Sequence, residues 1–339
     1  MSRNHFFHQR QRYEVIDRMT IGWKTFLVTR QLSGSQRQRF LAFDPHAGPG
    51  GALRVIQLLP PDEATWQRVQ VLQRLGQRHA EWPAILEFHR RSGDIVLVQA
   101  WVEGRDLHWW IAEMRRTQQQ RMGTPEAMRL FRGLAHALYH YHHHCHLVHA
   151  DIAPANIIFS PHSRRLVFID FGSAWTAERT AFRCAGDGSR PVYAALEYAA
   201  DSIAVDFRAD YFSLAAVGYE ILTQQVPYDG LGGRAGSPMY REQSDSLYIP
   251  PSQLSREAAT IDRRAWTAID ALLGTALQID RDKRFATGQE WLNAWQSVHD
   301  IVQQPAKRSW IDRLLFRFAA LFDRTPPANV HPTQPPRSS

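Results

Sequence analysis

Cysteine, lysine and long apolar runs are all scarce in this chain of 339 residues. Its two cysteines, Cys145 and Cys184, are too few for a disulfide framework, which indicates a reducing compartment such as the cytoplasm. No run of about 18 consecutive apolar residues is present, so we expect no membrane-spanning helix. The basic start of the chain is not followed by an apolar segment, so we expect no secretory signal peptide.

Almost all of the 40 basic residues are arginines, and the formal net charge is +7. This excess of positive charge is compatible with acidic substrates, with nucleic acid or with an anionic membrane surface. The arginines form no basic stripe with interleaved aromatic residues, so we expect no nucleic-acid partner. The apolar residues, 44% of the chain, are sufficient for one large domain or for two modest lobes.

The most informative stretch of the sequence is 147–172. It consists of short apolar segments separated by polar turns, and Asp151, Asn156 and Asp170 stand at the ends of these segments. Carboxylate and amide oxygens grouped in this way suit a hard cation better than zinc. The stretch therefore predicts a site for a magnesium-bound polyphosphate.

The order and spacing of these residues resemble the catalytic loop and metal-binding motif of protein kinases. His149-Ala150-Asp151 is followed after four residues by Asn156, and Asp170-Phe171-Gly172 comes a short hairpin later. The resemblance covers 13–303 and implies ATP and Mg²⁺ as cofactors. It implies that Asp151 orients or deprotonates the attacking hydroxyl and that Asn156 and Asp170 hold the metal. It also implies structural roles for His149, Phe171 and Gly172.

Three further matches favour protein kinases over small-molecule kinases of the same fold. Ala195-Leu196-Glu197 stands where the family has Ala-Pro-Glu. Asp210 corresponds to the aspartate that ties a buried helix to the catalytic loop, and Arg284 is placed to pair with Glu197. Since this set accompanies peptide-substrate binding in the family, we expect a protein as substrate or binding partner.

The resemblance implies an α+β, two-lobed fold with a small antiparallel-sheet N-lobe and a large helical C-lobe. We expect a flexible basic arm over 1–12, the N-lobe and hinge over 13–104, the C-lobe over 105–303, an amphipathic helix over 304–324 and a disordered tail over 325–339. Apolar alternation predicts strands at 26–28, 39–43, 52–59, 85–88 and 94–98, which make a five-stranded sheet. Apolar spacing predicts helices over 62–75, from Thr124 to the catalytic loop, and over 212–222, 266–277 and 287–298, with a surface loop at 228–246.

The nucleotide-binding side departs from the family pattern. Gln99, Ala100, Trp101 and Val102 stand at the interlobe hinge, where the family binds adenine through backbone groups, and Gln99 is an unusual polar residue for the back of that pocket. The phosphate-covering loop has one glycine, Gly34, instead of three. The phosphate-contacting lysine is replaced by Arg54, whose planar fork fits such a site poorly.

Further substitutions bear on catalytic power. Arg68 stands where the family has a helix glutamate, and Glu63 or Lys24 is the candidate to compensate. Ala153 replaces the lysine two residues after Asp151, which removes a positive charge from the transferred phosphoryl group and predicts slow phosphoryl transfer. Ala150 replaces the arginine before Asp151. Because Ala150 offers no cation to a phosphate, we expect no activation by phosphorylation of Ser173, Thr176, Thr180 or Ser189.

Two hypotheses on function follow, an atypical serine/threonine protein kinase of low activity and a pseudokinase that acts as a nucleotide- or partner-regulated scaffold. The retained Asp151, Asn156 and Asp170 favour the enzyme, whereas Arg54 and the missing glycines favour the scaffold. Phosphoryl transfer to a small molecule is a weaker third hypothesis.

Two other features admit more than one interpretation. His140 and His144 have the spacing of a helical metal pair, although a solvated helix end is the commoner arrangement. The segment 310–322, from Trp310 to Phe322, has one apolar face that suits a membrane interface, the kinase lobe or a partner, and it is too short to span a membrane.

Overall fold

The computed structural model describes residues 5–32, 38–75, 79–119, 122–171, 174–176, 190–198 and 205–304. Met1–Gln303 and Gln304–Ser339 are separate units, and all the secondary structure described belongs to the first. Gly34, Gly172, most of the segment after Phe171 and residues 305–339, with the expected amphipathic helix and tail, lie outside the described residues. Within the described ranges, no helix has the length and apolarity needed to cross a membrane.

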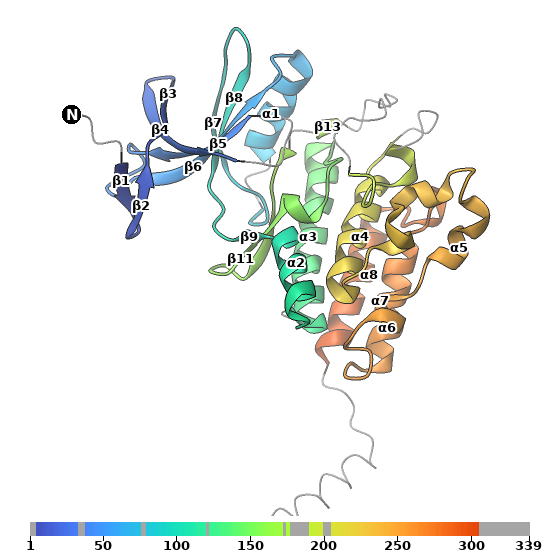
Figure 1. The fold of residues 1–339 in the computed structure, drawn as a ribbon. Coiled ribbons are helices and arrows are strands. Elements are labelled where there is room, and N and C mark those ends of the chain that lie inside the picture. Colours follow the sequence, from blue (N-terminus) through green and yellow to red (C-terminus); the bar gives the residue numbers. More distant parts are fainter. Residues whose placement is uncertain are drawn as a thin grey trace, which may run out of the picture. The chain divides into compact units, whose positions relative to one another are not determined.

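Six antiparallel strands form the sheet of the N-lobe (Figure 1). They are β3 (Asp17–Ile21), β4 (Lys24–Gln31), β5 (Arg39–Asp44), β6 (Ala52–Leu59), β7 (Ile85–Arg90) and β8 (Ile95–Ala100), in the spatial order β3-β4-β5-β6-β8-β7. The last five confirm the predicted strands. The predicted total of five was wrong because β3 also joins the sheet, through a two-residue turn in which Gly22 has a φ of +58°.

Residues 5–14 also differ from the expected flexible arm. They form a hairpin of β1 (His5–His8) and β2 (Gln11–Glu14), with a turn at Gln9 and Arg10, which have φ values of 46° and 64°. The ring of Phe6 stacks on Tyr13 at 5.3 Å and on Phe43 of β5 at 4.3 Å between centroids. These aromatic contacts, which the basic composition of the segment conceals, order the hairpin.

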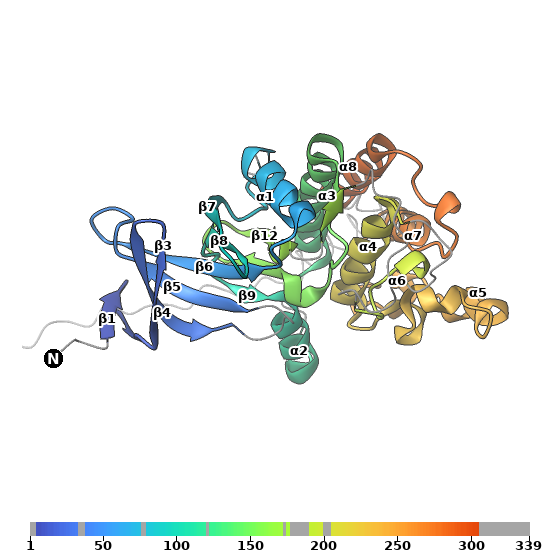
Figure 2. The ribbon, with the colours of Figure 1, turned by 90° about the horizontal axis from the view of Figure 1, so that it is seen from above.

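Helix α1 (Glu63–Leu75) packs on β7 and β8, as Figure 2 shows, and confirms the predicted N-lobe helix. It begins after Asp62, whose carboxylate accepts a hydrogen bond from the backbone amide of Thr65 at 2.8 Å. Val69 and Leu72 are buried, so the apolar face of α1 belongs to the core.

The C-lobe is built on helices, and the four predicted for it are confirmed. Its helices are α2 (Leu107–Thr117), α3 (Thr124–Cys145), α4 (Arg208–Thr223), α5 (Ser244–Leu247), α6 (Pro251–Leu254), α7 (Arg263–Ala276) and α8 (Gly288–Gln303). The segment 228–246 is not a plain surface loop: it contains the 3-10 turns η5 (Pro227–Gly230), η6 (Gly232–Gly236) and η7 (Arg241–Gln243) together with the start of α5, and Ala235 is fully buried. The expected division into an antiparallel-sheet N-lobe and a helical C-lobe is therefore confirmed.

The predicted loop-and-hairpin stretch lies between the two lobes. Its elements are β10 (Leu147–Val148), the 3-10 turn η2 (Pro154–Asn156), β11 (Ile157–Ser160) and β12 (Arg165–Phe168), while β9 (Arg105–Asp106) pairs with β11 and β13 (Trp175–Thr176) with β10. Ile157 is opposite Phe168 in the β11–β12 register. This register places Asn156 and Asp170 at the same end of the hairpin.

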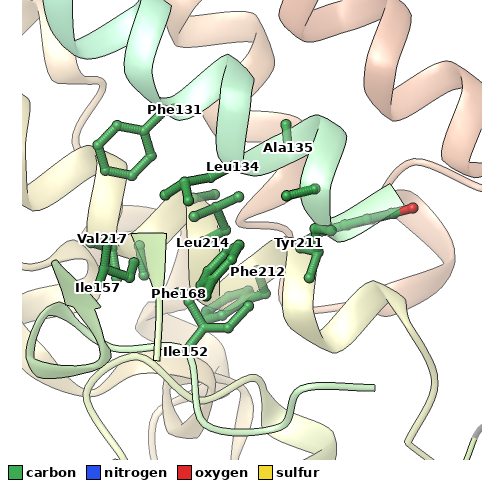
Figure 3. Close-up of a cluster of buried hydrophobic side chains, with 14 of the residues drawn as sticks. Phe131, Leu134, Ala135, Ile152, Ile157, Phe168, Tyr211, Phe212, Leu214 and Val217 are labelled. Atoms are coloured by element: carbon green, nitrogen blue, oxygen red, sulfur yellow. The ribbon is translucent and has the colours of Figure 1, made fainter. Parts of the chain in front are cut away.

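A buried cluster below the hairpin fixes its position. Figure 3 shows side chains of α3, α4 and the loop stretch gathered in one cluster. Ile152, Ile157 and Phe168 contribute from the stretch, and each is at most 3% exposed. The stretch is thus anchored in the core by these apolar side chains, while Asp151 and Asp170 stay partly exposed.

Candidate active site

Asp151 and Asn156 are joined directly. The Asn156 side-chain amide donates hydrogen bonds of 2.9 Å to the backbone oxygen of Asp151 and to its Oδ2. Asn156 is 2% exposed, so its orientation is fixed by burial as well. Since both bonds use the NH₂ group, the side-chain oxygen of Asn156 is the atom suited to a cation.

Asp210, at the start of α4, holds the catalytic loop from below. Its carboxylate accepts hydrogen bonds from the backbone amides of His149 at 2.7 Å and Ala150 at 2.9 Å, and it lies 2.8 Å from Nε2 of His142. Asp210 is fully buried. The sequence placed Asp210 against this loop, and these bonds are the contacts by which it acts there.

His149 is enclosed by aromatic rings. It is fully buried, and the rings of Phe168, Phe171 and Trp82 lie 5.4 to 6.2 Å from it between centroids. Burial lowers the pKa of its imidazole below the ordinary value. His149 and Phe171 therefore act in packing.

Trp82 is a residue that the sequence analysis did not single out. It lies between α1 and β7, yet its ring stacks on Tyr141 of α3 at 4.5 Å and contacts Phe168 and Phe171 at 4.9 and 4.7 Å. The neighbouring carbonyl of Glu81 accepts a hydrogen bond of 2.9 Å from the backbone amide of Phe168. A lone tryptophan outside any predicted element was the signal available for it.

Asp170 is bound by two side chains of the N-lobe sheet. Its Oδ2 lies 3.1 Å from Nη1 of Arg39 on β5, and its Oδ1 accepts a hydrogen bond of 3.1 Å from Nε2 of Gln57 on β6. Arg39 is 9% exposed and Gln57 is 1% exposed. Asp170 itself has a φ of 65°, a conformation that aspartate tolerates better than most residues. Arg39 and Gln57 were both missed from the sequence.

A cavity of about 50 Å³ adjoins Asp170 and the end of β8. The predicted hinge residues Gln99, Ala100, Trp101 and Val102 line it, together with Val55 and Gln57 of β6 and Arg39. Two of its lining side chains hold a buried donor with no hydrogen-bond partner, Nε of Arg39 and Nε2 of Gln99. The cavity is thus small, and two of the donors around it have no hydrogen-bond partner.

Arg54 does not lie in this cavity. Side chains alternate between the faces of a strand, and Val55 and Gln57 face the cavity. Arg54 stands between Leu53 and Val55 and points to the other face, where its Nε is 3.9 Å from Oδ2 of Asp44. The structure therefore does not bring Arg54 together with Asp170, and Gln57 is the β6 residue that reaches the carboxylate.

The two compensating residues proposed from the sequence are engaged elsewhere. Lys24 pairs with Glu87 at 3.0 Å, and Glu63 pairs with Arg90 at 2.8 Å. Both contacts lie within the N-lobe, and neither supplies the ion pair for which the sequence analysis expected Glu63 or Lys24 to compensate.

The histidines at the end of α3 do not form a metal centre. The rings of His140 and His144 are 4.6 Å apart between centroids. Among the described residues, no group of three or more His, Cys, Asp or Glu side chains could hold a metal ion.

The comparison with family models decides the classification. A model of the protein kinase domain matches residues 57–296, which is more than half of the chain. This chain belongs to the protein kinase family. The matched segment begins at Gln57 and includes the catalytic loop, Asp170 and Arg284.

The relatives of this kinase domain include bacterial serine/threonine kinases. Serine/threonine-protein kinase PknJ of Mycobacterium tuberculosis is 29% identical over 280 residues, which cover 79% of this chain and 44% of PknJ. PknF of the same organism is 29% identical over 213 residues, covering 60% and 44%. The chain thus spans less than half the length of these curated relatives.

The fold of this kinase domain is also found among solved structures. The crystal structure of the Mycobacterium tuberculosis PknI kinase domain matches with a TM-score of 0.54 and 22% sequence identity, over 80% of this chain and 95% of that one. At this identity the match concerns the fold alone.

Glu197 and Arg284 form a buried pair in the C-lobe of the kinase domain. Two guanidinium nitrogens of Arg284 lie 2.6 and 3.1 Å from the two Glu197 oxygens. Arg284 also donates to the carbonyl oxygens of Gln278 and Ile279 at 2.7 and 3.1 Å. Because nearly every donor of Arg284 forms a hydrogen bond, the Glu197–Arg284 pair holds the end of the activation segment in place.

Arg68, which the sequence analysis aligned with the helix glutamate of the family pattern, lies on α1 of the kinase domain. It donates hydrogen bonds to the carbonyl oxygen of Ala174 and to Oγ1 of Thr65. Arg68 thus ties α1 to the segment that follows Phe171.

Proposed function

We propose that this chain is an atypical serine/threonine protein kinase of low activity. It binds ATP and Mg²⁺ between the lobes and transfers the terminal phosphoryl group to a protein hydroxyl. The observation that supports this proposal is the convergence of Asp151, Asn156 and Asp170 at one end of the β11–β12 hairpin, with the loop held by Asp210. A scaffold without chemistry has no need of all three groups in this arrangement.

The residues present fit magnesium. Asn156 and Asp170 offer oxygen donors, and Mg²⁺ is usually held by one or two such side chains together with substrate phosphates. The contacts of Asp170 with Arg39 and Gln57 do not exclude a metal, because each carboxylate oxygen accepts more than one partner. When bound, the ion neutralises charge on the phosphates.

Asp151 is the proposed group for the substrate hydroxyl. Its Oδ2 is held by Asn156, so the carboxylate keeps one orientation while it orients the hydroxyl and accepts its proton. Phosphoryl transfer relies mainly on such positioning and on charge neutralisation.

We propose slow turnover because positive charge is missing near the transferred group. Ala153 stands where the family has a lysine, and its uncharged side chain offers no cation to the phosphoryl oxygens. Adenine would meet the backbone of Ala100 and Val102, with Gln99 behind it.

The second candidate is the pseudokinase that acts as a nucleotide- or partner-regulated scaffold, here in its partner-regulated form. It is favoured by the contact between Arg39 and Asp170 and by the small cavity beside it, about 50 Å³, whereas ligand sites usually measure about 300 to 1,000 Å³. In this alternative, Arg39 permanently closes the site.

The deciding experiment is a thermal-shift titration of the purified chain with ATP, with and without Mg²⁺, beside the Asp170→Asn variant. A ligand that binds only the native state raises the melting temperature by mass action, so weak binding is detectable. We expect a magnesium-dependent shift that is lost in Asp170→Asn. Transfer of labelled phosphate to a protein, abolished by Asp151→Asn, then tests the enzyme, and the absence of any shift supports the scaffold.

We further propose a cytoplasmic location and a protein substrate or binding partner. Free, buried Cys145 is compatible with a reducing compartment. The segment 310–322 stays our candidate for peripheral membrane contact.

A further inference from the structure

Arg39 occupies an unusual place for an arginine. It projects from β5 into the cleft, where it is 9% exposed, and its Nη1 lies 3.1 Å from Asp170. A charged side chain is rarely buried to this extent unless it is paired and hydrogen-bonded. Its Nε is buried without an acceptor, so the contact with Asp170 satisfies the guanidinium only in part.

Strand β6, next to β5, has no charged side chain opposite Arg39. Family members have their phosphate-contacting lysine on the strand that corresponds to β6. Here the β6 side chain that reaches Asp170 is Gln57, which is neutral and donates a single hydrogen bond of 3.1 Å to that carboxylate. The cation beside Asp170 therefore lies on β5, the strand next to β6.

We infer that Arg39 is the phosphate-contacting cation of this kinase domain and that Gln57 positions Asp170 beside it. A guanidinium has several donors in a fixed fork, so Arg39 can keep one on Asp170 and direct others, Nε included, to phosphate oxygens of the nucleotide. The inference rests on the proposed function, because it requires a nucleotide in the cleft. Arg39 is a positioning residue for the phosphates, and Asp151 keeps the chemical role.

The register of the sheet excludes the nearest competitor. Leu41 and Val55 are opposite each other in the β5–β6 register, and Arg39 is opposite Gln57. Since side chains two residues apart share a face, Arg39, Gln57 and Val55 all face the cleft. Arg54 is one residue out of this register and lies beside Asp44 instead.

The test compares nucleotides with and without phosphates on the full chain. Dissociation constants for Mg·ATP, Mg·ADP and adenosine are measured by calorimetry for the wild type, Arg39→Gln, Arg54→Gln and the double variant Arg39→Gln/Gln57→Lys. We expect Arg39→Gln to weaken ATP and ADP at least about tenfold, as for a lost hydrogen bond to a charged group, with adenosine changed less than about twofold. We expect Arg54→Gln to bind ATP as the wild type does.

The double variant restores the cation on the strand used by the family. We expect its preference for ATP over adenosine to return to within about threefold of the wild type, because Gln57 already contacts Asp170. If Arg39→Gln alone does not fold, the double variant, which retains a cation beside Asp170, is used instead, and the ratio of its dissociation constants for adenosine and ATP is measured. If this ratio is near one, the inference is overturned.

The outcomes separate this inference from the proposed function. If Arg39→Gln binds ATP as tightly as the wild type or more tightly, the proposed role of Arg39 is overturned, and Arg39 instead competes with the nucleotide for the site. Nucleotide binding by the chain would still stand. If Arg54→Gln no longer binds ATP while Arg39→Gln still does, the phosphate-contacting role belongs to Arg54 instead. No binding of ATP or adenosine by any variant overturns the proposed function, and the inference with it.

Discussion

The carboxylate of Asp210 accepts the backbone N–H of Ala150 at 2.9 Å, and Ala150 has a left-handed φ of 65°. A residue with a Cβ atom adopts this conformation only when its surroundings enforce it. The same carboxylate accepts the amide of His149 at 2.7 Å. One buried side chain of α4 thus sets the backbone path that delivers Asp151 to the cleft.

Replacement of Asp210 by Asn is expected to loosen the catalytic loop. An amide has one acceptor oxygen and directs its NH₂ group at the backbone donors, so a buried donor loses its partner, at a cost of about 1 to 3 kcal/mol. Urea unfolding measures the change. Asp106→Asn is the control, because Asp106 caps α2 at the surface and Asn caps equally well. Equal effects of the two variants would contradict the role of Asp210.

Glycine is expected to be tolerated at position 150 but not at position 153. Ala150 has a φ of 65°, which glycine adopts without strain, whereas Ala153 is extended with a φ of −155°. Both side chains are buried, so the free-energy cost of removing the methyl group is similar at the two positions. Ala150→Gly should therefore cost about 1 kcal/mol less than Ala153→Gly in chemical denaturation. A reversed order would show that the loop relaxes on substitution.

Arg284→Met is expected to destabilise the C-lobe strongly. It leaves Glu197, 3% exposed, as an unpaired buried charge, and breaking one side of such a pair costs about 3 to 5 kcal/mol. The matched control is Arg164→Met, which removes a surface pair with Glu126 of the same 2.6 Å separation and should cost less than about 1 kcal/mol. The free energies of unfolding decide. Similar values for both would mean that water reaches the Glu197 pair.

The stability of the protein is expected to fall as the pH drops below about 6.5. Burial lowers the folded-state pKa of His149 from 6.5, and it also contributes to lowered pKa values of His136 and His143. In this pH range the unfolded chain therefore binds more protons than the folded chain, so the free energy of unfolding rises with pH. The full contribution of these histidines to stability is present above this range. Urea titrations at about pH 7.5 and 5.5 test this, since these values lie on either side of the ordinary histidine pKa. His149→Phe should show a smaller difference in the free energy of unfolding between the two pH values. An unchanged difference would mean that other groups cause the pH dependence.

Phosphorylation of the activation segment is expected to leave activity unchanged. The family docks such a phosphate on an arginine before the catalytic aspartate, and Ala150 stands there, 2% exposed. The candidate positions Ser173, Thr180 and Ser189 lie outside the described residues. Phosphate transfer is measured for Thr180→Glu and Ser189→Glu beside the alanine variants. A rise in the glutamate variants alone would refute this prediction.

The sequence predicted α1, α3, α4, α7, α8 and the loop stretch, because their signals are local, but it missed α2, α5 and α6. Asn156 and Asp170 flank a hairpin whose two strands read directly as apolar segments. The partners of Asp170 were missed for the opposite reason, since Gln57 contacts it from 113 positions earlier in the chain. Which β6 residue faces the cleft depends on the register of the whole sheet, and this register selects Gln57 where the family pattern had pointed to Arg54.

Trp82 links the N-lobe to the core of the C-lobe. The segment between α1 and β7 belongs to the N-lobe in sequence, yet the Trp82 ring is stacked on Tyr141 in the C-lobe core. The Trp82 stack joins the lobes in addition to the contacts of Arg39 and Gln57 with Asp170. An opening of the cleft that separates the sheet from Asp170 has to break the Arg39 and Gln57 contacts, whereas the stack of Trp82 on Tyr141 can persist because it lies in the core of the C-lobe.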